Sequence, residues 1–244
     1  MLSKLRVNTF RQPTKFLTLP AQIIPKNYNM RVEILSSYNS IIHQIIAELR
    51  DQQIQKDRYR FRKNIERFGM IAAYEISKRL TYLSTKTTTP LGIADTHELE
   101  HQPVVATVLR AGLPLQTGVN AMFNQADLAY ISAFRKHTSA TEFEIVVEYL
   151  ACPKIEGRTL ILTDPMLATG RSLALTYEQF LRHGTPKEVH LVSLIGSKPG
   201  LEYIKTHIPD ATLWIGTVDE ELDERGYIIP GLGDAGDLSF GEKE

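Results

Sequence analysis

The stretch LILTDPMLATGRS, residues 160–172, joins an apolar strand to a helix through a loop of small and hydroxyl residues. Its apolar run stops at Asp164 and Pro165, and a helix-like segment begins at Ser172. Open parallel sheets bind ligands at the carboxyl ends of their strands. Backbone N–H groups at the start of the next helix are unpaired and attract anions. The stretch therefore predicts an anion site suited to phosphate, with a capped strand-to-helix turn as the alternative.

The composition of the loop favours close approach of a ligand to the backbone. Ala168, Thr169 and Gly170 are small, and Thr169 and Ser172 add hydroxyl donors. The glycine spacing and the Gly-Lys-Ser/Thr ending of the nucleoside triphosphate P-loop are absent. Arg171 places a long cation in this loop, and arginine rarely adopts positive φ. Either the loop is distorted at Arg171, or the side chain simply points outward.

The chain around the loop alternates apolar runs with helix-like segments. The predicted buried strands are 103–109, 128–134, 158–163, 188–196 and 211–216. A helix over 172–184 closes at Gly184. Residues 143–150, with Glu144 and Glu148 among branched residues, are predicted as an exposed extended β-arm. This pattern predicts an α/β fold with a mostly parallel central sheet and helices on both faces.

The N-terminal part of the chain has a different pattern. Residues 38–50 predict an amphipathic helix with Ser40 as its N-cap, and residues 57–83 predict a longer one. Residues 1–32 contain no acidic residue, and we expect a loosely ordered basic extension there. Ordinary patterning begins after Met30, which is therefore a candidate alternative start. We expect residues 33–244 to form a single domain.

The overall composition excludes some classes of partner. Lysine plus arginine number 28, as do aspartate plus glutamate, so bulk attraction to nucleic acid or an anionic membrane is not expected. No apolar stretch approaches the ~20 residues of a membrane helix. The basic residues between Arg58 and Arg67 are interpreted as a solvated face. The lone Cys152 allows no intrachain disulfide and favours a reducing compartment, hence a cytoplasmic location.

Three motifs in this order resemble one known family. DPMLATGRS (164–172) resembles the ribose-5-phosphate loop DPMLATGGS of the uracil phosphoribosyltransferases, and VLRAGLPL (108–115) resembles that family's ILRAGLGM. GYIIPGLGDAGDLSFG (226–241) is similar to its C-terminal uracil-binding signature. The resemblance covers residues 33–244 and implies a type I phosphoribosyltransferase-like fold. GLGDAG within the signature matches a dinucleotide fingerprint only formally, because the chain ends too soon after it.

The resemblance also implies an activity and a set of site residues. The reaction would join uracil to 5-phospho-α-D-ribose 1-diphosphate (PRPP), giving UMP and diphosphate in pyrimidine salvage. The residues implied in catalysis are Arg110, Arg135 and Asp234. Those implied in binding PRPP are Arg110, Arg135, Asp164, Pro165, Met166, Leu167, Ala168, Thr169, Gly170, Arg171, Ser172 and Asp234. Those implied in binding uracil are Ile228, Gly233, Asp234 and Ala235.

Cofactors and partners follow from the same resemblance. Mg²⁺ is expected to arrive with PRPP and to lie near Asp164. GTP is an effector of some family members, and a homodimer or a higher homo-oligomer is expected. Two alternatives stay open: a pyrimidine-responsive regulator that binds RNA, and a non-catalytic ligand-binding relative. Pro114 replaces a family glycine and is expected to stiffen the turn after Arg110.

Overall fold

The computed structural model describes residues 30–137 and 143–243. Its central sheet has the strand order β1-β10-β9-β7-β4-β5-β6, with the short β8 beside β9. Neighbouring strands are parallel except β5 and β6, which are antiparallel. The strands are β1 (Arg31–Ile34), β4 (Val104–Leu109), β5 (Asp127–His137), β6 (Phe143–Ala151), β7 (Thr159–Thr163), β8 (Met166–Leu167), β9 (Glu188–Ser197) and β10 (Thr212–Asp219). The predicted mostly parallel α/β sheet is confirmed.

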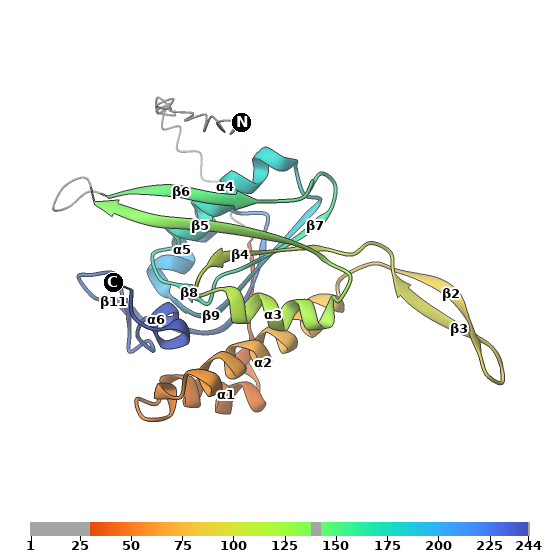
Figure 1. The fold of residues 1–244 in the computed structure, drawn as a ribbon, viewed down its shortest axis with the longest axis horizontal. Helices are drawn as coiled ribbons and strands as arrows, with labels where there is room; N and C mark the ends of the chain where they lie inside the picture. Colours follow the sequence, from red (N-terminus) through yellow and green to blue (C-terminus); the bar gives the residue numbers. More distant parts are fainter. Residues whose placement is uncertain (1–29, 138–142, 244) are drawn as a thin grey trace, which may run out of the picture.

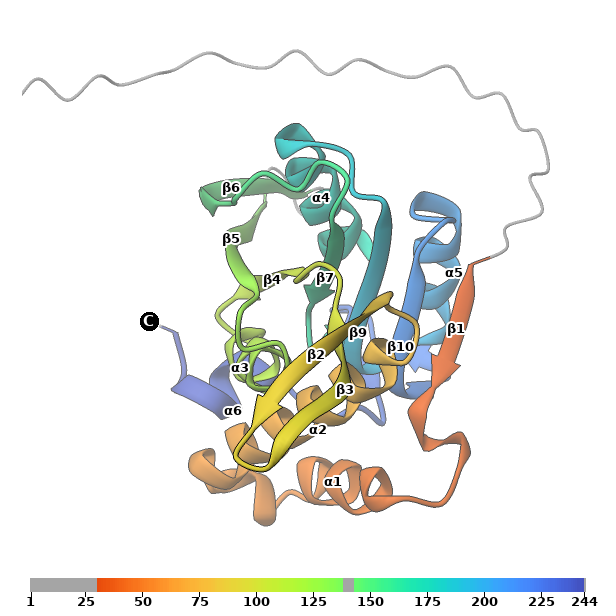
Figure 2. The ribbon, with the colours of Figure 1, turned by 90° about the vertical axis from the view of Figure 1, so that its right-hand side faces the viewer.

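Helices cover both faces of this sheet (Figures 1 and 2). On one face lie α1 (Ile41–Arg50), α2 (Arg58–Ser77) and α3 (Leu113–Met122); on the other lie α4 (Arg171–Phe180) and α5 (Lys198–His207). Side chains of β7 alternate between the two cores: Ile161 packs under the first set of helices, whereas Leu160 and Leu162 pack under the second. Strands buried on both faces need apolar residues throughout, which explains the unbroken apolar runs.

The two N-terminal helices begin close to where the sequence predicts, but the second one ends earlier than predicted. Ser40 is the N-cap of α1, and its Oγ accepts a bond from the Ile42 N–H at 3.3 Å. The prediction of a helix reaching residue 83 is wrong, because α2 ends at Ser77. The chain after it, rich in threonine, enters a β-strand instead, as β-branched residues favour.

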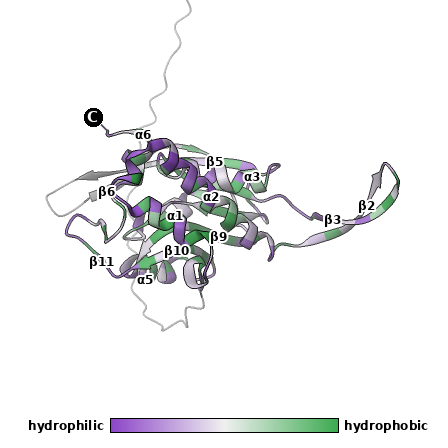
Figure 3. Ribbon diagram, turned by 90° about the horizontal axis from the view of Figure 1, so that it is seen from below, coloured by the Kyte–Doolittle hydropathy of each residue, from purple (hydrophilic) through white to green (hydrophobic). Residues whose placement is uncertain are grey.

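A projecting hairpin follows α2. Strands β2 (Tyr82–Thr89) and β3 (Gly92–Leu99) pair antiparallel and extend away from the body (Figures 1 and 3). This hairpin is the extended arm of the molecule. The segment predicted as an arm, 143–150, is instead edge strand β6, because it pairs with β5 and packs Val147 and Leu150 against the core.

Two other expectations concern the N-terminal extension and membrane-spanning helices. Residues 1–29 of the predicted basic extension lie outside the described residues, whereas Met30 is buried and β1 begins at Arg31. Across the described residues, no helix combines the length and the apolar character needed to cross a membrane.

Two glycines set the distance between α2 and α3. A Cβ on Gly118 would lie 2.0 Å from the Glu66 carbonyl oxygen, and one on Gly69 would lie 2.6 Å from the Leu115 carbonyl oxygen. Both clashes are with backbone, so a larger residue would push the helices apart. Helix α3 begins at Leu113, three residues after Arg110, so this close contact also constrains the path of the chain near Arg110.

We expect Gly118→Ala to lower the free energy of unfolding by about 1–3 kcal/mol, because overpacking displaces backbone that cannot yield. Gly92→Ala in the arm is the control, since nothing lies within 4 Å of its added Cβ; its effect should stay within about 0.5 kcal/mol. Urea unfolding of both variants checks this. Equal stability of the two variants would contradict the account of the contact.

Candidate functional site

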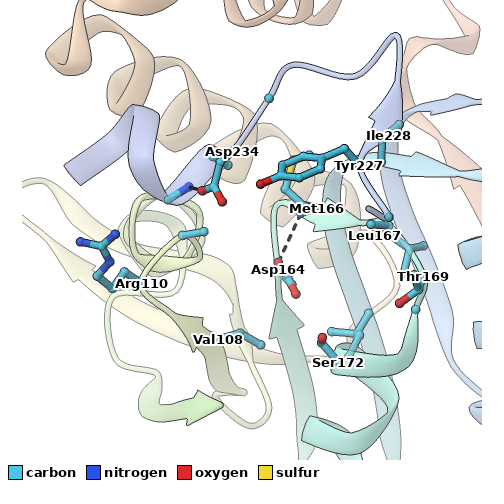
Figure 4. A pocket seen from close by; sticks show the side chains of 18 of the residues that line it. Val108, Arg110, Asp164, Met166, Leu167, Thr169, Ser172, Tyr227, Ile228 and Asp234 are labelled. Carbon is cyan, nitrogen blue, oxygen red and sulfur yellow. Dashed lines mark hydrogen bonds between the residues drawn. The ribbon is translucent and has the colours of Figure 1, made fainter. Parts of the chain in front are cut away.

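A cavity of about 320 Å³ opens at the carboxyl ends of β4 and β7. Three segments far apart in sequence line it: residues 108–111, the loop around 164–173, and the C-terminal segment around 225–236. Figure 4 shows Arg110 on one side, Thr169 and Ser172 on the other, and Asp164 between them. The cavity therefore collects all three motifs of the sequence, as expected for the carboxyl edge of a parallel sheet.

The anion loop has the geometry of an uncapped helix start. Gly170 precedes α4 with φ of 74°, and no side chain caps this end of the helix. A Cβ on Gly170 would also meet the Gly200 carbonyl oxygen at 2.8 Å. The loop rests on the start of α5, where the Ser197 hydroxyl donates to the Ala168 carbonyl at 2.6 Å. A seated loop with uncapped N–H groups is suited to hold a phosphate.

Arg171 does not distort this loop. Positive φ falls on Gly170, and no described non-glycine residue has it. Arg171 is the exposed first residue of α4, and its neighbours Gly170 and Ser172 line the cavity. Of the two outcomes left open by the sequence, the undistorted loop is therefore correct. Pro114 also fits without strain, because it lies in the first turn of α3, where proline is favoured.

Asp164 is a half-buried carboxylate at the centre of the cavity. It follows β7 directly, and its Oδ1 accepts a bond from the Met166 N–H at 3.3 Å (Figure 4). Burial raises the pKa of Asp164 to about 6, and the bond from Met166 offsets only part of that rise. The next residue, Pro165, is buried, and its carbonyl accepts bonds from the N–H groups of Leu194 and Ile195.

Arg110 contacts the C-terminal helix α6 (Ala235–Phe240). Its Nη2 donates to Asp237 Oδ1 and to the Gly241 carbonyl, both at 3.2 Å. Its Nε is buried and has no hydrogen-bond partner in the described part of the chain. A buried donor without a partner is costly, so this nitrogen is a candidate contact for an anionic ligand.

The C-terminal segment covers the cavity from a third side. Strand β12 (Ile228–Ile229), within this segment, pairs antiparallel with β11 (Glu221–Leu222), which precedes it. Asp234 caps α6, its Oδ1 accepting from the N–H groups of Gly236 at 2.8 Å and Asp237 at 2.9 Å. The implied uracil-binding residues Ile228, Gly233, Asp234 and Ala235 all line the cavity.

The cavity is lined by most, but not all, of the residues implied in binding PRPP. The implied PRPP residues that line it are Arg110, Asp164, Met166, Leu167, Ala168, Thr169, Gly170, Ser172 and Asp234. Arg135 lies in β5 opposite Ile145, and its role stays a prediction. Three further residues that the sequence motifs did not predict as site residues also line the cavity: Tyr227, Arg225 and Lys243. Only Tyr227 had a signal, since it stands in the C-terminal signature.

The chain is similar to known uracil phosphoribosyltransferases. The family model described as uracil phosphoribosyltransferase matches residues 36–242. A uracil phosphoribosyltransferase of Porphyromonas gingivalis is 46% identical over 215 residues, covering 88% of this chain and all of that protein. One of Pyrococcus furiosus is 36% identical over 204 residues, covering 82% and 86%. The solved structure of the AQ2163 protein from Aquifex aeolicus has a TM-score of 0.77 at 28% identity, covering 86% and 98%.

Motifs, cavity and relatives converge, and the family match spans nearly all of the described residues. The relatives also match over most of their own lengths. This chain belongs to the uracil phosphoribosyltransferase family.

Proposed function

We propose that this protein transfers the phosphoribosyl group of PRPP to uracil, giving UMP and diphosphate in pyrimidine salvage. The observation that carries the proposal is one cavity lined by both an anion loop and the C-terminal base-binding signature. A uracil nitrogen would attack the anomeric carbon as the bond to diphosphate breaks, and the uracil proton would leave to solvent. Such a site must hold two substrates side by side, and the cavity has a distinct wall for each.

The anion loop would hold the 5′-phosphate of PRPP. The hydroxyls of Thr169 and Ser172 and the N–H groups at the start of α4 are its donors. Asp164 would accept bonds from the ribose hydroxyls, since it stands between this loop and Arg110 (Figure 4). Phosphate and ribose would thereby be fixed before the base arrives, which lowers the entropic cost of the reaction.

The opposite wall would hold the base. Uracil presents an N–H donor between two carbonyl acceptors, and backbone groups of Ile228, Gly233 and Ala235 can match that edge. A site built to bond such an edge strongly rejects bases with another pattern. Both capping bonds of Asp234 use Oδ1, so Oδ2 is the oxygen we assign to the ribose side.

Charge on the leaving diphosphate would be met by arginine. The Nε of Arg110 lacks a partner in the described structure, and a guanidinium can bond two phosphate oxygens at once. Arg135 is assigned the same role by resemblance alone. Cations aimed at charge that develops during the reaction stabilise the transition state more than the ground state.

Magnesium fits this site as a companion of the substrate. Among the described residues, no three His, Cys, Asp or Glu side chains gather in a group that could hold a metal. Two carboxylates, Asp164 and Asp234, line the cavity, and magnesium binds through substrate phosphates with few protein ligands. Bound Mg²⁺ would neutralise diphosphate charge, with Asp164 near it through a water.

The partners proposed are small molecules in the cytoplasm, with neither nucleic acid nor membrane among them. A homodimer or higher homo-oligomer is proposed because the arm exposes Leu91 fully and Ile93 by 72%. Exposed apolar side chains of this kind mark interaction surfaces. GTP as an effector rests on the family resemblance only.

The decisive assay mixes the protein with Mg²⁺, PRPP and each nucleobase in turn. We expect UMP and diphosphate with uracil, and no product with cytosine or hypoxanthine. Failure to form UMP, with and without GTP, would overturn the proposed activity and favour the non-catalytic relative. Formation of a nucleotide from hypoxanthine instead of uracil would show that the substrate base is a purine.

Arg110→Gln should lower kcat about 100-fold or more, because it removes a cation aimed at the leaving diphosphate. Arg60→Gln, exposed on α2, is the matched control and should leave kcat unchanged. Thermal unfolding of both variants tests for loss of folded protein, since Arg110 also holds α6. A folded Arg110→Gln enzyme with normal kcat would remove Arg110 from the mechanism.

The raised pKa of Asp164 predicts a pH dependence. Above pH 6 the carboxylate is ionised and accepts ribose hydroxyls; below it the carboxyl becomes neutral and binding weakens. We expect kcat/KM for PRPP to fall as pH drops through about 6. The ratio of wild type to Asp164→Asn, measured from pH 5 to 8, cancels ionisation of the substrate. A ratio that is flat with pH would contradict this assignment.

A further inference from the structure

A buried ion pair behind the cavity joins two distant elements. Arg50 is the last residue of α1, and Asp219 is the last residue of β10. Nη1 of Arg50 lies 2.9 Å from Asp219 Oδ2, and its Nη2 lies 2.6 Å from Oδ1. The side chain of Asp219 is only 8% exposed and that of Arg50 23%. This two-point contact fixes the relative orientation of both side chains.

The same pair holds one residue of the C-terminal loop by both of its backbone polar groups. Asp219 Oδ2 accepts a bond from the Gly231 N–H at 2.9 Å, and Arg50 Nη1 donates to the Gly231 carbonyl at 3.3 Å. Gly231 has φ of 56°, and a Cβ there would lie 2.1 Å from the Ile228 carbonyl oxygen. Gly231 is therefore bound on both its polar groups, in a conformation reserved for glycine.

Gly231 lies between the residues proposed to bind uracil. Ile228 precedes it, and Gly233 and Ala235 follow it; all three line the cavity. Neither Arg50 nor Asp219 appears among the described residues that line the cavity. The pair therefore acts on the loop from behind. The backbone of Arg50 is itself held in place, because the buried Gln55 donates from Nε2 to the Arg50 carbonyl at 3.2 Å.

Stability alone is a weak reason for such a pair. Desolvation of two charges costs about as much as their attraction returns, and apolar residues of similar volume often serve as well. Apolar residues cannot, however, bond a peptide N–H and C=O in fixed directions. Recognition of a flat base by backbone groups needs that directionality, since small misplacements weaken binding strongly.

We propose that Arg50 and Asp219 are positioning residues for the nucleobase. By holding Gly231, they place the backbone groups of Ile228, Gly233 and Ala235 at the spacing that the base edge requires. The identity of the base rests on the proposed function. The clamp itself, defined as Arg50, Asp219 and the backbone N–H and C=O of Gly231, rests on the distances given above.

Two variants test the clamp. Asp219→Asn retains an oxygen acceptor but removes the charge opposite Arg50, and Arg50→Lys retains charge but loses the fork. Matched controls are Asp127→Asn and Arg158→Lys. In that pair Arg158 Nη1 lies 2.5 Å from Asp127 Oδ2, and Arg158 also bonds backbone carbonyls, but at the amino ends of β5 and β7, away from the cavity.

We expect each clamp variant to raise the KM for uracil about tenfold, because a charge-assisted bond is lost. The KM for PRPP should stay within about twofold, because the anion loop is untouched. A purely structural role predicts a different result: fewer folded molecules, hence lower kcat with both KM values unchanged. Uracil KM values within twofold of wild type in both variants, or equal increases in the controls, would overturn the proposal.

Hydrogen exchange gives a readout that needs no activity. Amides of residues 228–236 should exchange faster in the clamp variants than in wild type, and the controls should not differ from wild type. Unchanged exchange in both clamp variants would overturn the clamp even if uracil binding weakened. If Asp219→Asn does not fold, the hydrogen exchange and uracil KM of Arg50→Lys decide whether the clamp stands. A wild type that makes no UMP, with faster exchange in the variants, would overturn the proposed function and leave the clamp standing.

Discussion

Strand β7 constrains everything around the site, because every one of its five residues is buried between parallel neighbours β4 and β9. A parallel strand with both edges paired and both faces covered can present polar groups only where it ends. At that end the chain continues into Asp164 and the anion loop, while β4 ends beside it at Leu109, directly before Arg110. The cavity exists because these two strands end together.

Groups at this end are held at a cost to the folded protein. Since burial raises the pKa of Asp164 to about 6, ionising it above that pH works against folding. The Nε of Arg110 is likewise buried without a partner among the described residues. A ligand would offset both costs if its hydroxyls bonded to Asp164 and its anionic oxygens bonded to Arg110. Such unsatisfied groups are what a preorganised binding site is expected to contain.

The third wall is built differently from the other two. Residues 226–236 add no strand to the central sheet, since their strand β12 pairs with β11 in a separate two-stranded ladder, so side chains must locate them. Arg110 and Arg62 hold α6 through Asp237 and the Ser239 carbonyl, while Arg50 and Asp219 hold Gly231. The third wall of the cavity therefore depends on α1 and α2, which contribute little else to it.

By itself, the sequence determined the sheet and its loop, because apolar runs and the small residues of 164–172 reflect local burial and backbone needs. It also determined the family, through motifs that are contiguous in the chain. Only the tertiary structure decided where α2 ends, that the arm is β2–β3 rather than residues 143–150, and that Arg171 leaves the loop undistorted. The same holds for Arg50 and Asp219, whose partnership spans 169 positions and leaves no local pattern. Contacts between distant segments depend on packing, which residue spacing does not encode.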